Sequence, residues 1–374
     1  MVAISYGLTI DEQTVAPEVL AAIERIDVED HADLADIMRL RLGVGVRADG
    51  SAWTVIDDDL FPRLARLTLT VSVGTGSRQT LLDAYVVETR IELASAPGRS
   101  RLEVVALDPT VLMNLEEKVR AWPDMADSDI ASTLFGEYGF QSEVEPTQPS
   151  RAEIDAATVQ RETDIQFLRR LAVRNGYEVY VEIGPASGVV EGHFHPPRTE
   201  EAAQGVLSVN LGAATNVDAF RARLDMLRPA TVAVAGIEAE GQSDQSAEAS
   251  GTTRPELGAV SALPSERQRR VLLSQTGLAQ GGELQTLAQA VVDQSAWAIV
   301  AEGDLNAAAY GGVLRAKRPV MVRGAGRTFS GRYYVERVLH SFDANGYVQR
   351  FALRRNALGL TGQESFVDDG ALPS

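Results

Sequence analysis

The chain has 374 residues, of which 45% are hydrophobic and 23% charged, and its formal net charge is −17. These values fit a globular protein of two or three domains and argue against global disorder. The absence of cysteine excludes disulfides, zinc–thiolate sites and a cysteine nucleophile. The excess of acidic groups disfavours sequence-independent binding to nucleic acid or to anionic lipid, because both need a basic face.

No targeting or membrane segment is predicted. The first twenty residues lack a basic start followed by an apolar run, and no stretch of about 18 apolar residues occurs in the chain. We therefore expect synthesis and assembly in a reducing cytoplasm, with no membrane partner.

Alternating apolar and polar residues predict a first β domain over residues 1–108. Residues 67–73 read LTLTVSV, which places four apolar side chains on one face of a strand. Residues 85–93 repeat this arrangement, and residues 101–107 supply a third strand. Together with residues 52–61, these strands are expected to form a meander or small barrel.

Helical signals follow and predict a helical or α+β insertion domain over residues 109–190. In Asp108-Pro109, aspartate suits an N-cap and proline suits the first turn, so a helix is expected from there to just before Pro123. A second helix is predicted from Asp127-Ser128 to Gly139. It is short and amphipathic.

The third predicted helix has the most complete start and stop signals. Thr163 at the cap is followed three residues later by Gln166, which forms a capping box, and Asn175-Gly176 is a terminator. Ile165, Leu168 and Leu171 fall on its inward side.

A second β domain is predicted over residues 191–360. Its expected elements are strands at 206–211 and 230–236, a helix at 283–302, and strands at 313–322, 331–342 and 347–354, with a hairpin turn at Asn345-Gly346. Residues 238–256 hold five acidic residues, one Arg and almost no large apolar side chain, so a flexible acidic loop is expected. Residues 361–374 are expected to form a flexible tail.

Four histidines occur, and only His193-Phe194-His195 forms a cluster. Its i, i+2 spacing places both rings on one face of a strand, a geometry that holds zinc if a third ligand such as Glu191 approaches. No supporting ligand is identifiable, so a pair of surface histidines before the Pro196-Pro197 turn is the preferred interpretation. His31 and His340 stand alone. No metal site is predicted.

Other chemistry-bearing patterns also favour structural interpretations. Gly74-Thr75-Gly76 and Gly324-Ala325-Gly326 lie between β segments, and neither is expected to open a helix, so hairpin turns are favoured over phosphate loops. The carboxylates of Asp57-Asp58-Asp59 and Glu116-Glu117 are ordinary in an acidic chain. Five arginines interleaved with apolar residues indicate a solvated strand face: Arg318, Arg323, Arg327, Arg332 and Arg337. We predict no catalytic or cofactor-binding residue, and not an enzyme.

One passage of the predicted insertion resembles the hub module of contractile injection machines. It reads Val159-Gln160-Arg161-Glu162-Thr163-Asp164-Ile165-Gln166-Phe167-Leu168-Arg169-Arg170-Leu171, then Asn175-Gly176-Tyr177. In that family a Gln, a Glu-x-Asp, a Phe and an Arg-Leu pair follow one another and close with a Gly before a strand. Leu107-Asp108-Pro109 and Phe135-Gly136-Glu137-Tyr138-Gly139-Phe140 fall where the family has its equivalents.

A second passage is similar to phage late control D proteins, which carry Gly-x-Gly-x-x-Phe-x-Gly-x-Tyr and a His before a hairpin. Here it runs from Gly324 to Tyr333, followed by His340-Ser341-Phe342. The two matches occur in the expected order and cover roughly residues 60–355.

The resemblance, which extends to the T4-type central hub and the N-terminal part of type VI secretion spikes, implies a homotrimer with two similar small β-barrel domains in each subunit. Three subunits then present six quasi-equivalent barrels in a ring, which joins a three-fold spike to a six-fold inner tube. The expected fold class is therefore a β-rich α+β protein with two small barrels and helical insertions.

The function that the resemblance implies is that of a structural baseplate hub in a phage tail or a related injection particle. Its expected partners are itself, a spike protein, the inner tube protein and other baseplate proteins. No repetitive needle follows the last predicted strand, so the spike is expected to be a separate protein. Two other classes stay open: a cell-wall hydrolase at the particle tip, and a β-rich adhesin or carbohydrate-binding module.

Overall fold

Strands dominate the computed structural model of the chain. It describes residues 3–47, 50, 52–96, 98–147, 158–184, 188–237, 244–264, 266–274 and 281–366. Helices in this part of the chain are few and mostly short, which confirms the predicted β-rich class. None of the described helices is long and apolar enough to cross a membrane.

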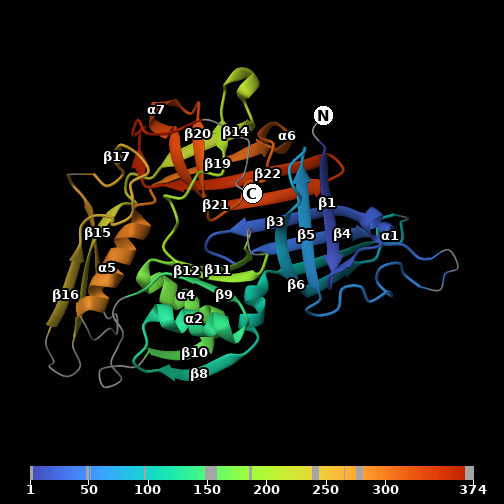
Figure 1. Ribbon diagram of the computed structural model, residues 1–374, viewed down its shortest axis with the longest axis horizontal. Coiled ribbons are helices and arrows are strands. Elements are labelled where there is room, and N and C mark those ends of the chain that lie inside the picture. The colour runs from blue at the N-terminus through green and yellow to red at the C-terminus, as the bar shows by residue number, and fades with distance from the viewer. Residues whose placement is uncertain are drawn as a thin grey trace.

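One sheet of 13 strands runs through both the early and the late parts of the chain (Figure 1). Its strands are β1 Ile4–Ile10, β2 Gln13–Thr14, β3 Ile23–His31, β4 Ile37–Gly43, β5 Arg66–Val73, β6 Gln79–Glu92, β7 Arg101–Leu107, β13 Val206–Ser208, β14 Val217–Leu224, β19 Ile299–Asn306, β20 Pro319–Arg323, β21 Gly331–Asp343 and β22 Gly346–Arg355. Neighbours follow the order β14-β19-β22-β21-β3-β4-β7-β6-β5-β1-β2, and β20 joins β13 to β21. The described strands form an open path, so the two closed barrels remain a prediction.

The same strand order occurs twice within this sheet. The first strand unit comprises β1 and β3–β7, and the second strand unit comprises β13, β14 and β19–β22. Each unit has six strands, which can be numbered one to six in chain order within that unit. In both units strand two pairs with strand three, three with six, six with five, and five with four, and all of these pairs are antiparallel. The last pair differs, because β1 is antiparallel to β5 and β13 is parallel to β20. The units meet where β21 pairs with β3.

Sequence alternation explains most of these strands. Leu67, Leu69 and Val71 of β5 are fully buried, whereas the threonines between them are half-exposed. Asn345-Gly346 turns β21 into β22 as predicted, with Gly346 at φ 119. Residues 52–61, expected to add a strand, form turns with one isolated bridge from Trp53 to Val46. Their apolar side chains still pack on the first core, which accounts for the misleading pattern.

A smaller body lies between the two strand units in sequence and appears in green in Figure 1. It contains the 3-10 helix η1 Pro109–Asn114, β8 Glu117–Trp122, α2 Asp127–Glu137, β9 Gln141–Val144, β10 Thr158–Thr163, α4 Asp164–Asn175, β11 Glu178–Ile183 and β12 Val190–His195. β8 pairs with β10, and β12 lies between β11 and β9. Trp122, Phe135, Phe167 and Phe194 are buried in its own core.

The predicted helix from Pro109 to Pro123 is wrong beyond its first turns. Asp108 caps it, with its carboxylate accepting from Thr110 N at 2.9 Å, but η1 ends at Asn114 and β8 follows. The helices predicted from 127 and 163 are confirmed as α2 and α4. The capping box is not formed, because the Thr163 hydroxyl donates to Asn114 Oδ1 at 2.8 Å.

A third group of elements lies beside the second strand unit. It consists of η2 Gly212–Ala214, β15 Ala230–Ile237, β16 Asp244–Ala249, β17 Val260–Ser261, β18 Arg269–Ser274, α5 Gly281–Ser295 and β23 Ala357–Leu358; the short helices α1 Pro17–Ala22, α6 Ala307–Tyr310 and α7 Gly326–Phe329 connect strands. β15 lies between β16 and β18, and α5 packs on this sheet.

Two predictions in this region need correction. The segment 238–256 is not all loop, because Asp244–Ala249 forms β16 against β15, with Ala247 and Ala249 buried; residues 238–243 lie outside the described residues. The predicted helix 283–302 ends at Ser295, because the chain turns at Trp297 and enters β19 at Ile299. In the predicted tail, residues 361–366 are described without regular structure and 367–374 lie outside the described residues.

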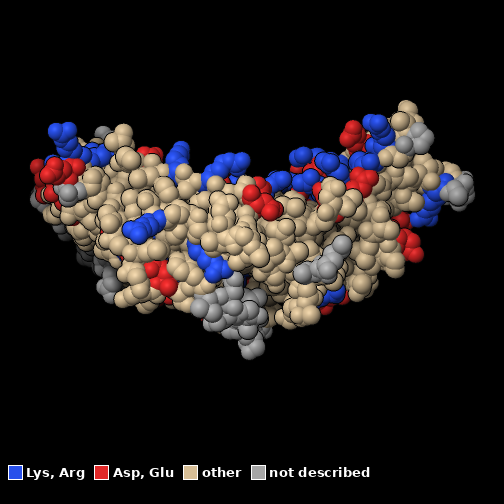
Figure 2. All heavy atoms as spheres, turned by 90° about the horizontal axis from the view of Figure 1, so that it is seen from above, with Lys and Arg blue, Asp and Glu red and all other residues tan. Residues whose placement is uncertain are grey.

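The molecule is elongated and one side of its outline is hollowed (Figure 2). Lys and Arg side chains gather along that hollowed outline, although the chain as a whole carries a charge of −17. The charge is therefore unevenly distributed over the surface.

Candidate functional site

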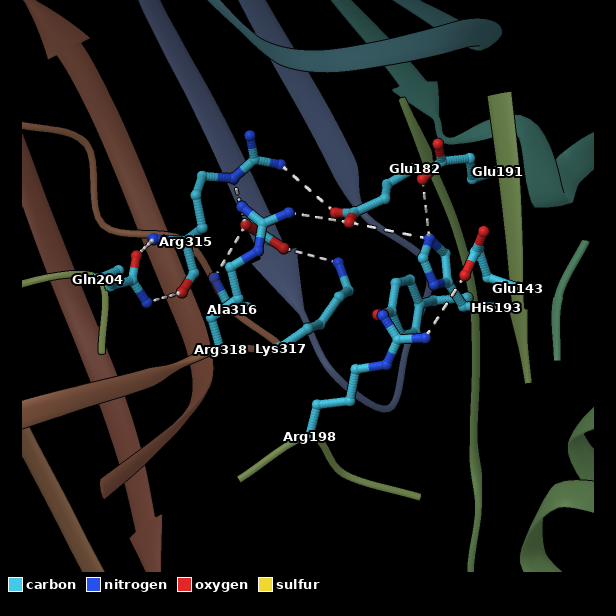
Figure 3. A network of polar contacts seen from close by, with 12 residues as sticks. Glu143, Glu182, Glu191, His193, Arg198, Gln204, Arg315, Ala316, Lys317 and Arg318 are labelled. Carbon is cyan, nitrogen blue, oxygen red and sulfur yellow. Dashed lines mark hydrogen bonds and ion pairs between the residues drawn. The ribbon is translucent and has the colours of Figure 1, made fainter. Parts of the chain in front are cut away.

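Six charged side chains from distant parts of the chain meet in what we call the ionic junction. Its members are Asp30, Asp36, Glu182, Arg315, Lys317 and Arg318. Figure 3 labels four of them, Glu182, Arg315, Lys317 and Arg318. The first strand unit contributes Asp30 at the end of β3 and Asp36 before β4, and β11 contributes Glu182. The three basic residues lie on the segment that enters β20.

Lys317 occupies the centre of the ionic junction. Its Nζ lies 2.7 Å from Asp30 Oδ1 and 2.8 Å from Asp36 Oδ2, and its side chain is only 2% exposed. Arg315 Nε donates to Asp30 Oδ2 at 2.9 Å. Lys317 has a φ of 65, a left-handed conformation that is unfavourable for a lysine and is held here by these contacts.

Glu182 extends the ionic junction into the small body. Arg318 Nη2 donates to Glu182 Oε1 at 3.0 Å, and Arg315 Nη2 lies 4.0 Å from Glu182 Oε2. A second ionic link lies nearby, where Arg354 of β22 pairs with Glu178 of β11. The Arg354 guanidinium is 4.9 Å from the Trp297 ring and 5.1 Å from the Tyr334 ring, so cation–π contacts add to this link.

The carboxylates of the ionic junction differ in pKa. Burial raises the pKa of Asp30, but Lys317 and Arg315 outweigh burial and hold that pKa well below its ordinary value. Burial raises the pKa of Asp36 to about 8, and the neighbouring Asp30 and Asp108 add to this rise against the effect of Lys317. The basic residues of the ionic junction therefore favour the ionised form of Asp30 more strongly than that of Asp36.

The ionic junction has no room for a substrate. A cavity of about 10 Å³ touches Asp36, Glu182 and Arg315, which is about the space of a single water molecule. The side chains satisfy one another instead of facing an open position. The arrangement therefore joins the two strand units and the small body, and this joining is the role that its chemistry supports.

The passage that resembles the hub family forms the polar centre of the small body. Asp164 accepts hydrogen bonds from Lys118 Nζ at 2.5 Å, Tyr138 OH at 2.6 Å and Gln160 Nε2 at 2.6 Å. The Phe167 ring stacks on Trp122 with a centroid distance of 6.3 Å. This passage therefore fixes α4 against β8 and α2.

The histidine pair is buried, so the expectation of surface histidines is wrong. The His193 ring stacks on Tyr180 at 4.4 Å, and His195 Nδ1 donates to the Pro196 carbonyl at 2.7 Å if that nitrogen carries the proton. Burial lowers the pKa of His193 to about 3 and of His195 to about 4, so both rings are neutral at pH 7.

Glu191 approaches this pair but does not complete a metal site. His193 Nε2 lies 3.7 Å from Glu191 Oε2 and 3.9 Å from Glu182 Oε1. Within the described part of the chain, no three His, Asp or Glu side chains are grouped so that they could hold a metal ion. His340, the other buried histidine, has Nδ1 at 2.8 Å from Tyr347 OH, and His31 is half-buried beside Asp33.

The two glycine passages connect strands. Residues 74–76 turn β5 into β6. Residues 324–326 lie between β20 and β21, and Gly326 opens the four-residue helix α7, so the expectation that neither passage opens a helix is wrong for this one.

The acidic runs shape loops or lie in solvent. Asp57 accepts from Trp53 N at 2.6 Å and Asp58 from Val55 N at 3.1 Å, whereas the side chains of Glu116 and Glu117 are exposed.

The five arginines between 318 and 337 do not share one strand face. Arg318 belongs to the ionic junction, Arg323 donates to Ser208 Oγ at 2.7 Å, and Arg332 donates to the Glu201 carbonyl at 2.6 Å. Arg327 lies on α7, and Arg337 is 3.6 Å from Glu29.

Comparison with known proteins identifies relatives of this fold. A tail protein from Neisseria meningitidis MC58 superposes with a TM-score of 0.65 at 12% identity over 95% of this chain and 97% of that one. The 43 kDa tail protein of prophage MuSo2 from Shewanella oneidensis gives 0.62 at 14% identity over 95% and 100%. The E. coli c3393 protein, a component of the type VI secretion system, gives 0.56 at 10% identity over 96% and 80%. No curated protein matches the chain.

These structures share the fold of this chain along nearly its whole length. In sequence, the model of one family, described as the Alg8 N-terminal domain, matches residues 10–344 and so covers the small body, the ionic junction and both strand units except most of β1 and all of β22. The chain belongs to the Alg8 N-terminal domain family.

Proposed function

We propose that the chain is a structural baseplate protein of a contractile tail or injection particle. The observation that carries this proposal is the shared fold with two tail proteins, one of them from a prophage, and with a type VI secretion component over at least 95% of the chain. The side-chain chemistry agrees, because the buried charged groups join parts of the chain and leave no space for a substrate.

Within this class we propose the role of hub, which adapts a three-fold spike to the six-fold inner tube. The repeated strand order supports this role, because each copy supplies two topologically similar units and three copies supply six. A homotrimer of this kind has one ring face for a spike protein and one for the first ring of tube protein. Other baseplate proteins, and assembly in the cytoplasm before incorporation into the particle, complete the proposal.

Light scattering coupled to gel filtration tests the assembly, and capture of co-expressed spike and tube proteins tests the partners. We expect the mass of three chains and retention of both proteins. A persistent monomer that retains neither protein refutes the hub role. Release of fragments from purified peptidoglycan by the chain alone would instead support a hydrolase.

A further inference from the structure

One edge of β6 is open along the second half of the strand. β5 pairs with β6 only as far as Tyr85, whereas β7 pairs with its other edge as far as Glu92. No described strand pairs with the free edge from Val87 to Glu92. Ile91 and the following Leu93 are 52% and 55% exposed, so apolar side chains accompany this unpaired backbone.

The far end of the large sheet presents a second open edge. Among the described strands, β14 pairs only with β19. Phe220, Ala222 and Leu224 are half-buried on the side of β14 that packs on the second core. Arg221 and Arg223 are exposed on the opposite side and form no ion pair with another described residue.

The pairing of β21 with β3 inside the chain is an example of the contact that the open edges of β6 and β14 could form between two copies. β21 holds the place in the second strand unit that β6 holds in the first, and β3 holds the place of β14. β21 pairs with β20 over Gly331–Tyr334 and then with β3 over Arg337–Asp343. β6 therefore matches β21 except that the strand equivalent to β3 is missing.

Four β-bulges place these strands in register. β21 shifts against β22 between Val335 and Arg337, and β6 shifts against β7 between Val86 and Glu88. β3 shifts against β4 between Ile23 and Arg25, and β14 shifts against β19 between Val217 and Ala219. A bulge changes which side chains face the core, so bulges at equivalent places fix the alignment of the two units.

We propose that β6 of one copy pairs antiparallel with β14 of a second copy of this chain, as β21 pairs with β3 within each chain. Transfer of the internal register through the bulges gives five consecutive central pairs. Thr89 lies opposite Leu224, Arg90 opposite Arg223, Ile91 opposite Ala222, Glu92 opposite Arg221, and Leu93 opposite Phe220 of the second copy.

Side-chain chemistry supports this occupant. The core-facing partners are apolar apart from Thr89. On the outer face Glu92 meets Arg221, which lies opposite Glu302 of β19 in its own chain and forms no ion pair with a described residue. Arg90 lies opposite Arg223, and two like charges repel each other. This repulsion is offset because Arg90 forms an ion pair with Glu88 of its own strand at 2.6 Å, and because Glu92 lies diagonally from Arg223.

The proposed contact joins different surfaces of the two copies, so each copy keeps one open edge until a ring closes. The inference rests on the proposed self-assembly of the hub and specifies the strands that carry it. It requires that the same two edges be used at every joint.

Crosslinking tests the register directly, because the chain has no cysteine of its own. Opposed positions in antiparallel strands have Cα atoms about 4.5–5.5 Å apart, within the range of a disulfide. The double variant Glu92→Cys with Arg221→Cys should give intermolecular disulfides that end in a closed oligomer. The matched control, Glu88→Cys with Arg221→Cys, moves one cysteine about 13 Å along the strand and should give at least tenfold less product.

Charged substitutions test the edge without a crosslink. Ile91→Lys and Leu93→Lys should each raise the dissociation constant of the oligomer at least tenfold, whereas Val119→Lys on β8, at a residue 84% exposed, should leave it unchanged. All three variants should keep the circular dichroism spectrum of the parent chain, because the replaced side chains are more exposed than buried.

The possible results separate this inference from the hub role. A stable oligomer that resists both lysine variants and gives no crosslink overturns the inference and leaves the hub role standing. Crosslinking in register without capture of spike or tube protein supports the inference and counts against the hub. A monomer at every concentration, with no crosslink, overturns both.

Discussion

Lys317 offers the sharpest test of the ionic junction. Replacing it by Met removes the cation that lies between Asp30 and Asp36 and keeps a side chain of similar length in the same left-handed backbone conformation. Breaking a buried ion pair by removing one partner costs about 3–5 kcal/mol. Total stabilities of about 5–15 kcal/mol make such a loss easy to measure.

The structure places the expected cost near the lower end of that range. Asp30 keeps Arg315 at 2.9 Å, and Asp36, whose pKa is raised to about 8 even with Lys317 present, can take up a proton once that cation is removed. We therefore expect Lys317→Met to lower the free energy of unfolding by about 3 kcal/mol. Asp30→Asn should cost more than Asp36→Asn, because Lys317 and Arg315 both stabilise the ionised form of Asp30, whereas Asp36 pairs with Lys317 alone.

Urea unfolding at pH 7, followed by tryptophan fluorescence and circular dichroism, measures these changes. Trp53, Trp122 and Trp297 report on the first strand unit, the small body and the region of Arg354 respectively. Arg270→Met removes an ion pair with Glu248 that is about two-thirds exposed and should cost no more than about 1 kcal/mol. If Lys317→Met costs no more than this control, the ionic junction does not hold the parts of the chain together.

Three further substitutions test other contacts. Gly192→Ala places a Cβ 2.4 Å from the Phe135 ring and should lower the free energy of unfolding in urea by about 1–3 kcal/mol. As the control, Gly136→Ala in α2 has open space for its Cβ and should raise that free energy by about 0.5–1 kcal/mol. Equal effects of the two substitutions would contradict the close packing of Gly192 on Phe135. Burial raises the pKa of Asp164, but hydrogen bonds from Lys118, Tyr138 and Gln160 outweigh it and leave this pKa below 3.8. The stabilisation that ionised Asp164 gives the folded state is therefore complete above pH 3.8 and is lost as pH falls through the folded pKa. The difference in urea midpoint between the parent and Asp164→Asn should accordingly shrink in acid. A constant difference would show that ionised Asp164 does not stabilise the fold. Arg355 donates to the carbonyls of Leu257, Ser330 and Gly359. A lysine cannot make all of these hydrogen bonds, so Arg355→Lys should speed amide hydrogen exchange in β17 and β23. Unchanged exchange would show that these hydrogen bonds do not hold the two strands in place.

Local pattern predicted the elements whose burial follows their own sequence. Alternation marked β5, and the asparagine–glycine pair marked the β21–β22 turn. β8 was missed because its apolar Val119 points to solvent, and its pairing with β10 lies about 40 residues away in sequence. Thr163 is the N-cap of α4 as predicted, but its capping box does not form, because its hydroxyl donates to Asn114 from a distant turn.

The ionic junction could not be predicted from local sequence. Asp30 falls on the same face of β3 as the buried Ile26 and Val28, but its partner Lys317 lies 287 positions later in the chain. Only the pairing of β21 with β3 brings them together. The helix that begins at Asp164 was predicted correctly, because its start and stop signals are local and its polar contacts lie within the small body.

The joint between β3 and β21 also bears on synthesis of the protein on the ribosome. β3 ends at His31, and its partner β21 begins 300 residues later, at Gly331. At about 5–20 residues per second, the nascent chain exposes this edge of β3 for about 15–60 seconds before its partner emerges. Arg25, Asp27 and Glu29 alternate along β3, and charges spaced in this way discourage pairing with a neighbouring nascent chain. The charges that flank the finished joint thus also protect the half-made protein from aggregation.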